Sequence, residues 1–405
     1  MTAIYSAIPR SDAVKLIKEH LNYTPKMEMV SLEDAIFRVA AEDIVSRINL
    51  PSVKSSRWDG IVFNYENYIN CQKNVKGWTL GKDYAFSNTG IGIFEDSFDT
   101  MVKIEETEFE DGKLIRIKQE NVMEGQQVIP VGERMAVGDI LVKKDTKIMP
   151  SQLNLLACGG VVNVPVYQPP KVAIIPTGNE LVPYNGIIGP GMTVESNSFS
   201  MAAKVKASGG IPVVFPIQSD DMEALKKALK SAASVSDIVV IGGGSGRGRY
   251  DLLQKTIEEI GTLYFSDVEH GPGKRTCFSV ISQTPVIGLV GPPGGEEITF
   301  DFYVLPAVEA CLNQKHIIRR VNAILDEDIP PHDRVSFYYT LKVTLKDGQY
   351  HATVLPHANI DRSIAEHNGY IFVKKTSQGY KKGDIAEVEL RVFYEKLIFN
   401  QGFIG

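Results

Sequence analysis

The sequence predicts a multidomain protein of the α/β plus β class, in which an α/β domain lies between two β-rich regions. The chain has 405 residues, more than one hydrophobic core holds at about 100–200 residues per domain. Strand and helix patterns alternate from Lys171 to about Leu312, and short strands separated by turn residues occur on both sides of that stretch. Hydrophobic residues make up 43% of the chain, which is enough to build packed cores and argues against disorder.

Three helices are expected before the α/β region. Residues 11–22 carry apolar side chains at helical spacing, with Ser11 and Asp12 as candidate caps. A second helix is expected over Ser31 to Asp43, because this stretch opens with Ser-x-x-Asp, close to a capping box. A third is expected over Ser151 to Ala157, ahead of a glycine pair.

The segment from Asn49 to about Gly138 is predicted to be rich in β-strands. Short alternating runs at Ile61–Phe63, Thr100–Ile104 and Lys113–Ile117 stand between Gly, Asn and Asp turns. Asp111-Gly112 predicts a hairpin between two strands.

The α/β region follows a linker at residues 167–170. The expected strands are Val172–Ile175, Ile211–Ile217, Asp237–Ile241, Thr276–Ile281 and Val286–Val290, and the expected helices are Ser198–Ala207, Asp221–Ala233 (capped by Ser219 or Asp220), Leu252–Ile260 and Ile298–Leu312. Alternation at these lengths builds a parallel sheet with crossover helices. Beyond Pro330-Pro331, strands at Ser336–Leu345 and Glu387–Phe393 and the turn Asp347-Gly348 predict a small β-barrel or sandwich.

Polar side chains follow three of the predicted strands. Glu180 follows the first, Asp220 the second, and a glycine loop ending in Asp251 the third. In open α/β sheets, ligands bind at this edge, near the switch point of strand order. Three carboxylates there suit a hard cation that keeps several waters, such as Mg²⁺.

The glycine loop, Gly243–Gly248, is the most specific of these elements. Backbone amides of a Gly-rich turn entering a helix make an anion cradle, and Arg247 and Arg249 add charge with a geometry suited to phosphate. The loop matches neither the Walker A pattern nor GxGxxG. It therefore predicts an anion without saying which.

Each of these elements also has a purely structural interpretation. The glycines could form a simple turn, Asp220 and Asp251 could cap helices, and the two arginines could be solvated surface charges. Convergence of the three loops on one sheet edge is what would make them a site.

Composition argues against several classes of protein. The net charge of −6 offers no field for nucleic acid. The four cysteines form no CxxC pair and the seven histidines no HExxH, so neither a disulfide framework nor a zinc site is expected. No apolar run approaches 18 residues and the N-terminus lacks the pattern of a signal peptide, so a cytoplasmic protein without a membrane segment is expected.

Short motifs spread along the chain resemble those of the molybdopterin molybdenumtransferases, the MoeA and gephyrin E-domain family. They are Ser55–Ile61, Thr89-Gly90, Gly132–Arg134, Pro176–Leu181, Glu195–Asn197, Ser219–Asp221, Gly243–Gly248 with Asp251, Gly271–Arg275 and Gly288–Pro293. Each motif is weak by itself, but they follow one another in the family's order, and the resemblance covers roughly residues 10–395.

The resemblance implies an elongated homodimer of four-domain subunits. The implied domains are a discontinuous linker and dimerisation domain (1–47 and 137–168), a β-rich insertion (48–136), a MogA-like α/β domain that binds molybdopterin (169–318) and a C-terminal β domain (319–405). The implied reaction cleaves adenylated molybdopterin, inserts molybdate into its dithiolene and releases AMP, with a divalent metal. A molybdopterin adenylyltransferase is a candidate partner.

The resemblance also assigns roles to residues of this sequence. The catalytic candidates are Asp59, Asp220 and Asp251, and the metal candidates are Glu180, Asp220 and Asp251. The candidates for binding the pterin nucleotide are Thr89, Thr177, Gly178, Gly243, Gly244, Ser245, Gly246, Arg247, Gly248, Lys274 and Pro293.

Several positions depart from the family pattern, among them Pro292 in place of an asparagine, Gly246 in place of a serine, and Arg57-Trp58 in place of an Ala-Met pair. Three further departures bear most on activity. Arg134 stands where the family has a carboxylate, Gly271 where it has a lysine, and Val290 where it has a proline. Two alternatives to an enzyme therefore stay open at this point: a divergent, non-catalytic molybdopterin- or nucleotide-binding paralogue, and a gephyrin-like dimeric scaffold.

Overall fold

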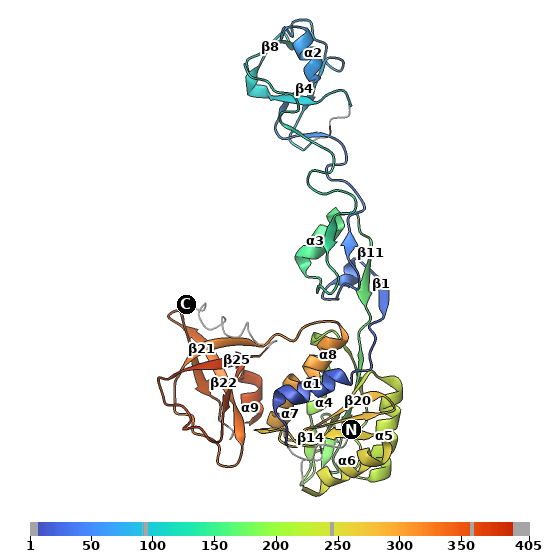
Figure 1. Ribbon diagram of the computed structural model, residues 1–405, viewed down its shortest axis with the longest axis vertical. Coiled ribbons are helices and arrows are strands. Elements are labelled where there is room, and N and C mark those ends of the chain that lie inside the picture. The colour runs from blue at the N-terminus through green and yellow to red at the C-terminus, as the bar shows by residue number, and fades with distance from the viewer. Residues whose placement is uncertain (1–6, 91, 93–95, 244–246, 357–359, 392–405) are drawn as a thin grey trace. The chain divides into compact units, whose positions relative to one another are not determined.

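The computed structural model describes residues 7–90, 92, 96–243, 247–356 and 360–391 (Figure 1), with the backbone alone for 247–251 and 360–361. The chain forms two compact units. One runs from Met27 to Tyr167, and the other combines the residues before Met27 with those from Gln168 onward. The change of unit after Tyr167 falls in the predicted linker, whereas the four domain limits given above stay a prediction.

A six-stranded sheet is the centre of the unit that contains the α/β region. Its strands lie in the order β15 (Ile211–Val214), β12 (Lys171–Pro176), β16 (Ile238–Gly242), β20 (Thr284–Leu289), β19 (Cys277–Ile281) and β17 (Thr262–Phe265). The first four strands are parallel, and the last two are antiparallel to their neighbours. The parallel sheet is thus confirmed for four strands, while Ser282 and Gln283, both at positive φ, turn β19 back along β20.

Helices cover both faces of this sheet (Figure 1). The helices α5 (Met222–Val235) and α6 (Arg247–Ile260) cover one face, where Leu229 and Ile257 pack on Ile175 and Ile241. The opposite face packs against α4 (Asn197–Ala207), α8 (Leu305–Cys311) and the N-terminal helix α1 (Arg10–Glu19). Helix α1 contributes Ala13 and Ile17 to that core. Its cap position is Pro9, so Ser11 and Asp12 lie within its first turn and do not cap it.

The long helix expected over Ile298–Leu312 is divided into three parts. These are α7 (Pro293–Thr299), a π-helical turn η3 (Phe300–Val304) and α8. Pro306 has no N–H and cannot complete the α-helical bond to the preceding turn, which explains the wider turn before it.

The expected helix over Ser31–Asp43 is wrong. The chain forms β1 (Met27–Ser31), paired antiparallel with β11 (Asn163–Tyr167), and a single 3₁₀ turn η1 (Glu33–Ala35). The Ser-x-x-Asp motif does make its contacts, since the Asp34 N–H donates to Ser31 Oγ at 3.2 Å. It caps only this turn, because Phe37 adopts a φ of 61° that ends any helix.

The β-rich insertion is confirmed. Its largest sheet has β4 (Gly60–Phe63) between β5 (Tyr84–Ser87) and β6 (Thr100–Lys103), and β7 (Thr107–Glu110) pairs with β8 (Lys113–Ile117). Asp111 and Gly112 form the predicted hairpin turn at φ 47° and 74°. The remaining elements of this unit are β2 (Ile44–Val45), β3 (Ser55–Ser56), α2 (Tyr65–Asn70), η2 (Ile104–Glu106), β9 (Val128–Ile129), β10 (Ile140–Val142) and α3 (Pro150–Cys158).

The C-terminal domain is a closed barrel, which decides between the predicted barrel and sandwich. Its strands follow the circuit β22 (Ser336–Lys346), β23 (Gln349–Val354), β21 (Arg319–Leu325), β25 (Ile385–Leu390), β24 (Gly369–Val373) and back to β22. The short strand β18 (His270–Gly271) of the α/β domain pairs with β22. Helix α9 (Ile360–Glu366) precedes β24. None of the helices in the described part of the chain is both long and apolar enough to cross a membrane.

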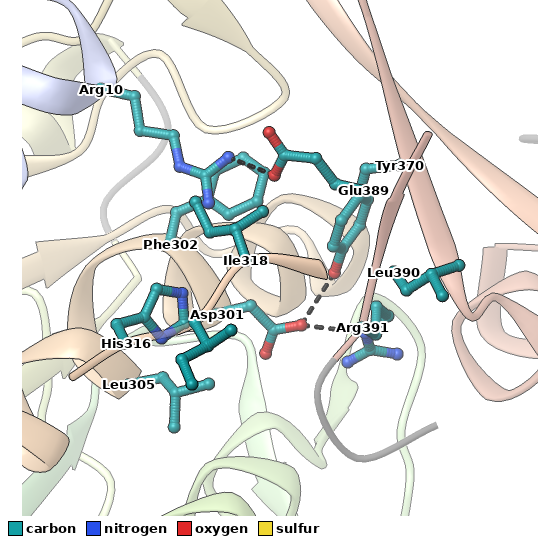
Figure 2. A pocket seen from close by; sticks show the side chains of 11 residues that line it. Arg10, Asp301, Phe302, Leu305, His316, Ile318, Tyr370, Glu389, Leu390 and Arg391 are labelled. Atoms are coloured by element: carbon teal, nitrogen blue, oxygen red, sulfur yellow. Dashed lines mark hydrogen bonds and ion pairs between the residues drawn. The ribbon is translucent and has the colours of Figure 1, made fainter. Parts of the chain in front are cut away.

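Buried ion pairs join the α/β domain to the barrel. Lys204 of α4 contacts Glu297 at 2.9 Å and Asp301 at 2.8 Å, and all three side chains are at most 12% exposed. Figure 2 shows how Asp301 also accepts hydrogen bonds from Arg391, at 2.9 Å, and from the Tyr370 hydroxyl, at 2.8 Å. Arg391 is the residue that follows β25, so the barrel supplies the second cation of the network.

The opposite charges outweigh the cost of burial in this network. Burial lowers the pKa of the Lys204 ammonium, but Asp301 and Glu297 raise it more, so the net shift is upward. Burial raises the pKa of Asp301, but Arg391 and Lys204 lower this pKa by a larger amount, so the net shift is downward. The network thus consists of Lys204, Arg391, Asp301 and Glu297, and all four groups are charged at neutral pH.

Replacing Lys204 by Met is expected to lower the free energy of unfolding by about 3–5 kcal/mol, because two buried carboxylates then share one cation. Urea unfolding followed by circular dichroism measures this change. The control is Lys381→Ala, which removes an exposed ion pair with Asp328 and is expected to leave the unfolding midpoint nearly unchanged. Equal midpoints for the two variants would contradict a stabilising role for the network.

Candidate functional site

A cleft of about 240 Å³ opens at the carboxyl ends of the parallel strands. Among the strands of this sheet, β15 is the next in sequence after β12 and lies on one side of it, whereas β16, the one after that, lies on the other side. Strand order therefore reverses between β12 and β16, which is where open α/β sheets bind ligands. The lining residues are Pro176, Thr177, Glu180, Leu181, Thr193, Val194, Glu195, Ser196, Asn197, Met201, Gly242, Gly243, Gly291, Pro292 and Pro293.

The ends of β12 and β16 are tied together at the floor of this cleft. The N–H and the hydroxyl of Thr177 both donate to the carbonyl oxygen of Gly242, at 2.8 and 3.0 Å. Gly243 follows at a φ of 121°, and a Cβ there would lie 2.2 Å from Thr177 Oγ1 and 2.3 Å from the Thr177 carbonyl oxygen. Only glycine fits this approach, so the start of the glycine loop is shaped by contact with the neighbouring strand.

The loops after β12 and β15 also meet. The Asn179 N–H donates to Asp220 Oδ2 at 3.2 Å, and the Asp220 N–H donates to Asn179 Oδ1 at 3.0 Å. The predicted cap of the helix that follows is corrected by the structure, since Asp221 accepts from the Ala224 N–H at 2.9 Å and caps α5. Asp220 is thus a bridge between two strand-end loops, and neither it nor Ser219 is the cap.

Glu195 and Asn197 belong to the cleft, although the sequence interpretation gave them no role in the site. The parallel pair β13 (Leu181–Pro183) and β14 (Thr193–Glu195) brings Glu195 to the cleft wall. The residue is 8% exposed, and its carboxylate accepts from the N–H of Ser198 at 2.9 Å and from the Ser198 hydroxyl. Asn197 donates to the Gly291 carbonyl oxygen at 2.9 Å and so ties α4 to the loop after β20. The motif Glu195–Asn197 was the signal that could have identified them.

The structure brings four of the predicted binding and metal residues to the cleft: Thr177, Glu180, Gly243 and Pro293. Gly178 adjoins them, and its N–H donates to the Gln218 carbonyl oxygen. Lys274 is exposed on the turn after β18 and is not among the lining residues. Arg247, Gly248 and Asp251 lie in the first turns of α6, but the side chains of Arg247 and Asp251, and all of Gly244, Ser245 and Gly246, are outside the described residues.

Asp59 and Thr89 lie in the other unit and form a pair there. Asp59 Oδ1 accepts from the Thr89 N–H at 2.6 Å and from the Thr89 hydroxyl at 3.0 Å. In the same unit, Glu133 forms an ion pair with Arg57, while the neighbouring Arg134 is exposed. The carboxylate beside Arg134 is thus already paired with another arginine.

The described side chains contain no group of three His, Cys, Asp or Glu residues placed to hold a metal ion. The predicted metal trio can be followed only through Glu180 and Asp220, because the Asp251 side chain is not described. Glu180 lines the cleft, and its carboxylate oxygens lie 3.0 Å from the position that a Cβ on Gly178 would take. Carboxylate oxygens beside an open cleft fit a cation that keeps part of its water shell.

Glu296, near the start of α7, is a buried acid with an unusual environment. The residue is 1% exposed, and its Oε1 atom has no hydrogen-bond partner among the described residues. Burial raises the pKa of this carboxyl from 4.5 to about 8; Lys204 opposes the shift, and Glu297, Asp301 and Glu195 add to it. Glu296 is therefore mostly protonated at neutral pH.

The raised pKa of Glu296 makes stability depend on pH. Between about pH 4.5 and pH 8 the folded protein keeps this proton while the unfolded chain releases it. The free energy of unfolding is expected to fall as pH rises through this window, by up to about 1.4 kcal/mol per pH unit from this group. Glu296→Gln, which imitates the protonated acid, should remove that slope.

Urea unfolding at about pH 5.5 and about pH 8.5 measures the slope. The control is Glu223→Gln, whose side chain is 80% exposed and which should keep the wild-type slope. If Glu296→Gln and wild type show the same pH dependence, the buried carboxyl does not carry the proton.

Two protein families match the chain, in sequence order. Residues 8–160 match the "MoeA N-terminal region (domain I and II)", and residues 173–310 match the family described as "Probable molybdopterin binding domain". The molybdopterin molybdenumtransferase of Bacillus subtilis is 28% identical to this chain, and the match covers 95% of this chain and 94% of the relative. The molybdopterin molybdenumtransferase of Staphylococcus epidermidis is also 28% identical, and the match covers 96% of this chain and 97% of the relative.

A solved structure of a molybdopterin biosynthesis MoeA protein from Pyrococcus horikoshii is also similar. It superposes with a TM-score of 0.83 at 27% identity, over 95% of this chain and 99% of that chain. The strand order, the cleft at its switch point and the match over residues 173–310 define a protein of the molybdopterin-binding α/β class. With the N-terminal region matched as well and relatives aligned nearly end to end, the chain belongs to the MoeA family. The resemblance found in the sequence is thereby confirmed.

Proposed function

We propose that this protein is a molybdopterin molybdenumtransferase of molybdenum cofactor biosynthesis, which inserts molybdate into adenylated molybdopterin and releases AMP. The observation that carries the proposal is the cleft at the switch point, where Thr177, Glu180 and Gly243 line one hollow and Asp220 is bonded to the adjoining loop. Relatives named for this reaction extend over nearly the whole chain. The two non-catalytic alternatives are not favoured.

The reaction hydrolyses the pyrophosphate bond of the adenylated substrate: a water oxygen bonds to the phosphorus on the pterin side, the bond from that phosphorus to the bridging oxygen breaks, and AMP leaves. Charge develops on the phosphate oxygens, so stabilisation must come from cations and from N–H donors held in place beforehand. We propose that Glu180 and Asp220, with Asp251, hold a hydrated Mg²⁺, which would supply that charge. The glycine loop after β16 and Arg247 would bind the phosphates, and Lys274 the anionic part of the pterin.

We further propose that Asp59, held by Thr89, takes part in catalysis, that the protein acts as a homodimer, and that it works in the cytoplasm. A molybdopterin adenylyltransferase would supply its substrate. These points rest on the family resemblance and on the Asp59–Thr89 pair, whose carboxylate keeps one oxygen that does not accept from Thr89.

Molybdate insertion is tested with purified protein, adenylated molybdopterin, molybdate and Mg²⁺, by measuring AMP release. Glu180→Gln is expected to lower the rate by about 100-fold or more, because the metal loses a charged ligand at the cleft. Glu223→Gln, on the exposed side of α5, is the matched control and should keep the wild-type rate. Absence of AMP release by the wild type would reject the function, and a rate independent of Mg²⁺ would reject the metal.

Arg134 is expected to slow the wild-type enzyme. The family has a carboxylate at this position, and a guanidinium stays charged at every physiological pH and repels a cation. Arg134→Asp should therefore raise the rate of AMP release, whereas Arg116→Asp, an equal change of charge at another exposed position of the same unit, should not. If wild type already works at the rate of ordinary family members and Arg134→Asp changes nothing, Arg134 is a surface residue without a role.

A further inference from the structure

Trp58, in the β-rich insertion, has a large aromatic side chain that is held in place although it is not buried. The residue is 49% exposed. Its indole N–H donates to Gln127 Oε1 at 3.0 Å, and the ammonium nitrogen of Lys103 lies 4.2 Å from the centroid of the indole ring. Trp78, the other tryptophan of the chain, packs instead on the buried ring of Phe63. Two directed contacts therefore fix the orientation of an exposed indole.

The backbone on either side of Trp58 is also fixed. The Arg57 N–H donates to the Gln127 carbonyl oxygen at 2.9 Å, and the Ile104 N–H donates to the Asp59 carbonyl oxygen at 3.0 Å. Gln127 itself has a φ of 59°, a left-handed conformation that residues other than glycine seldom adopt. Such a conformation persists only where the surrounding structure imposes it, and it is common beside functional sites. The loop between β3 and β4 thus presents the indole in one defined place.

The two side chains that hold the indole, those of Lys103 and Gln127, also line a polar hollow of about 590 Å³. The other lining residues are Glu106, Lys118, Gln119, Glu120 and Asn121. Amide groups donate and accept hydrogen bonds, and carboxylates accept them from ring N–H and amino groups. An aromatic face and a set of hydrogen-bonding groups therefore adjoin each other on this unit.

We propose that Trp58 binds the pterin ring of the substrate by stacking, with the hydrogen-bonding edge of that ring directed at the hollow. The inference rests on the proposed function. Molybdopterin carries its dithiolene and its phosphate at one end, and the uncharged pyrimidinone ring of the pterin at the other end. Catalysis takes place at the first end, and Asp59, to which we assign a part in it, directly follows Trp58 in the sequence. The ring at the second end therefore comes within reach of the indole.

The chemistry of the substrate divides it between two sets of residues. The dithiolene and the phosphates are anionic, so they suit Lys274, Arg247 and the metal proposed above. The pterin ring is planar and uncharged and carries both donors and acceptors, so it suits an indole face beside amide groups. Stacking accepts many kinds of planar ring, and the polar groups of the hollow would select the pterin among them.

Two substitutions of Trp58 separate stacking from apolar bulk. Trp58→Phe keeps an aromatic face, whereas Trp58→Leu keeps an apolar side chain without one. Because the side chain is half-exposed and lies on a loop, both variants should fold as the wild type does, which circular dichroism checks. The matched control is Phe86→Leu, which removes an aromatic ring about as exposed as Trp58 from β5 of the same unit.

The experiment measures the affinity of the full chain, in the presence of Mg²⁺, for molybdopterin, which has no adenylate, and for AMP, which has no pterin. Trp58→Leu is expected to bind molybdopterin about tenfold or more weakly than wild type, which is the loss expected from removing one aromatic stack. Trp58→Phe and Phe86→Leu should bind molybdopterin within about threefold of wild type, and all variants should bind AMP equally. Trp58→Leu with wild-type affinity for molybdopterin, or with an equal loss of affinity for AMP, would overturn the assignment.

Failure of this inference is distinguishable from failure of the proposed function. A wild-type protein that releases AMP in the insertion assay, while Trp58→Leu keeps the wild-type affinity for molybdopterin, contradicts the stacking alone. A wild-type protein that neither releases AMP nor binds molybdopterin rejects both.

Discussion

The buried network of Lys204, Glu297, Asp301 and Arg391 is the interaction on which the unit with the α/β domain and the barrel depends. Four charges taken out of water are tolerated only because each cation contacts both carboxylates, at 2.5 to 2.9 Å. The network links the helix that starts beside the cleft, the helix that starts at Pro293, and the last strand of the barrel. Its directional, charge-assisted bonds specify one relative arrangement of these elements, which non-directional apolar packing does less strictly.

That arrangement determines what the cleft can be. Asn197 opens α4 two residues after Glu195, and Pro292 and Pro293 open α7. The two helices joined by Lys204 and Glu297 therefore also carry two walls of the cleft. The other wall consists of the ends of the strands and the loops after them. Hydrogen bonds between Thr177 and Gly242 and between Asn179 and Asp220 hold these segments together. Most polar groups of the described wall are thus held by hydrogen bonds before any ligand arrives, which lowers the entropic cost of binding.

Glu296 shows what the same burial costs. It is next to Glu297 in the sequence, but it forms no ion pair with any residue that the structure describes, and it stays buried by keeping a proton. Glu297 stays charged because Lys204 and Arg391 outweigh its burial. Two adjacent acids of the same type therefore take opposite protonation states at neutral pH. The difference lies in which residues of distant elements pack against each one, and the sequence around them does not reveal it.

Local patterns in the sequence were enough for the class of fold, for most strands and helices of the α/β region and for the Asp111-Gly112 hairpin, because periodicity and turn residues act over a few neighbours. They also placed the loops of Glu180 and Asp220, and the start of the glycine loop at Gly243, at one sheet edge. They failed where distant contacts prevail: Ser31–Asp43 pairs as a strand with Asn163–Tyr167, and Pro306 widens a helix that periodicity predicts as continuous. The same holds for the cleft. The sequence pointed to Thr177, Glu180 and Gly243, which line it. Only the tertiary structure decided that Asp220 is a bridge and not a cap, and that Glu195 and Asn197 form part of the wall, since each depends on residues brought together from different elements.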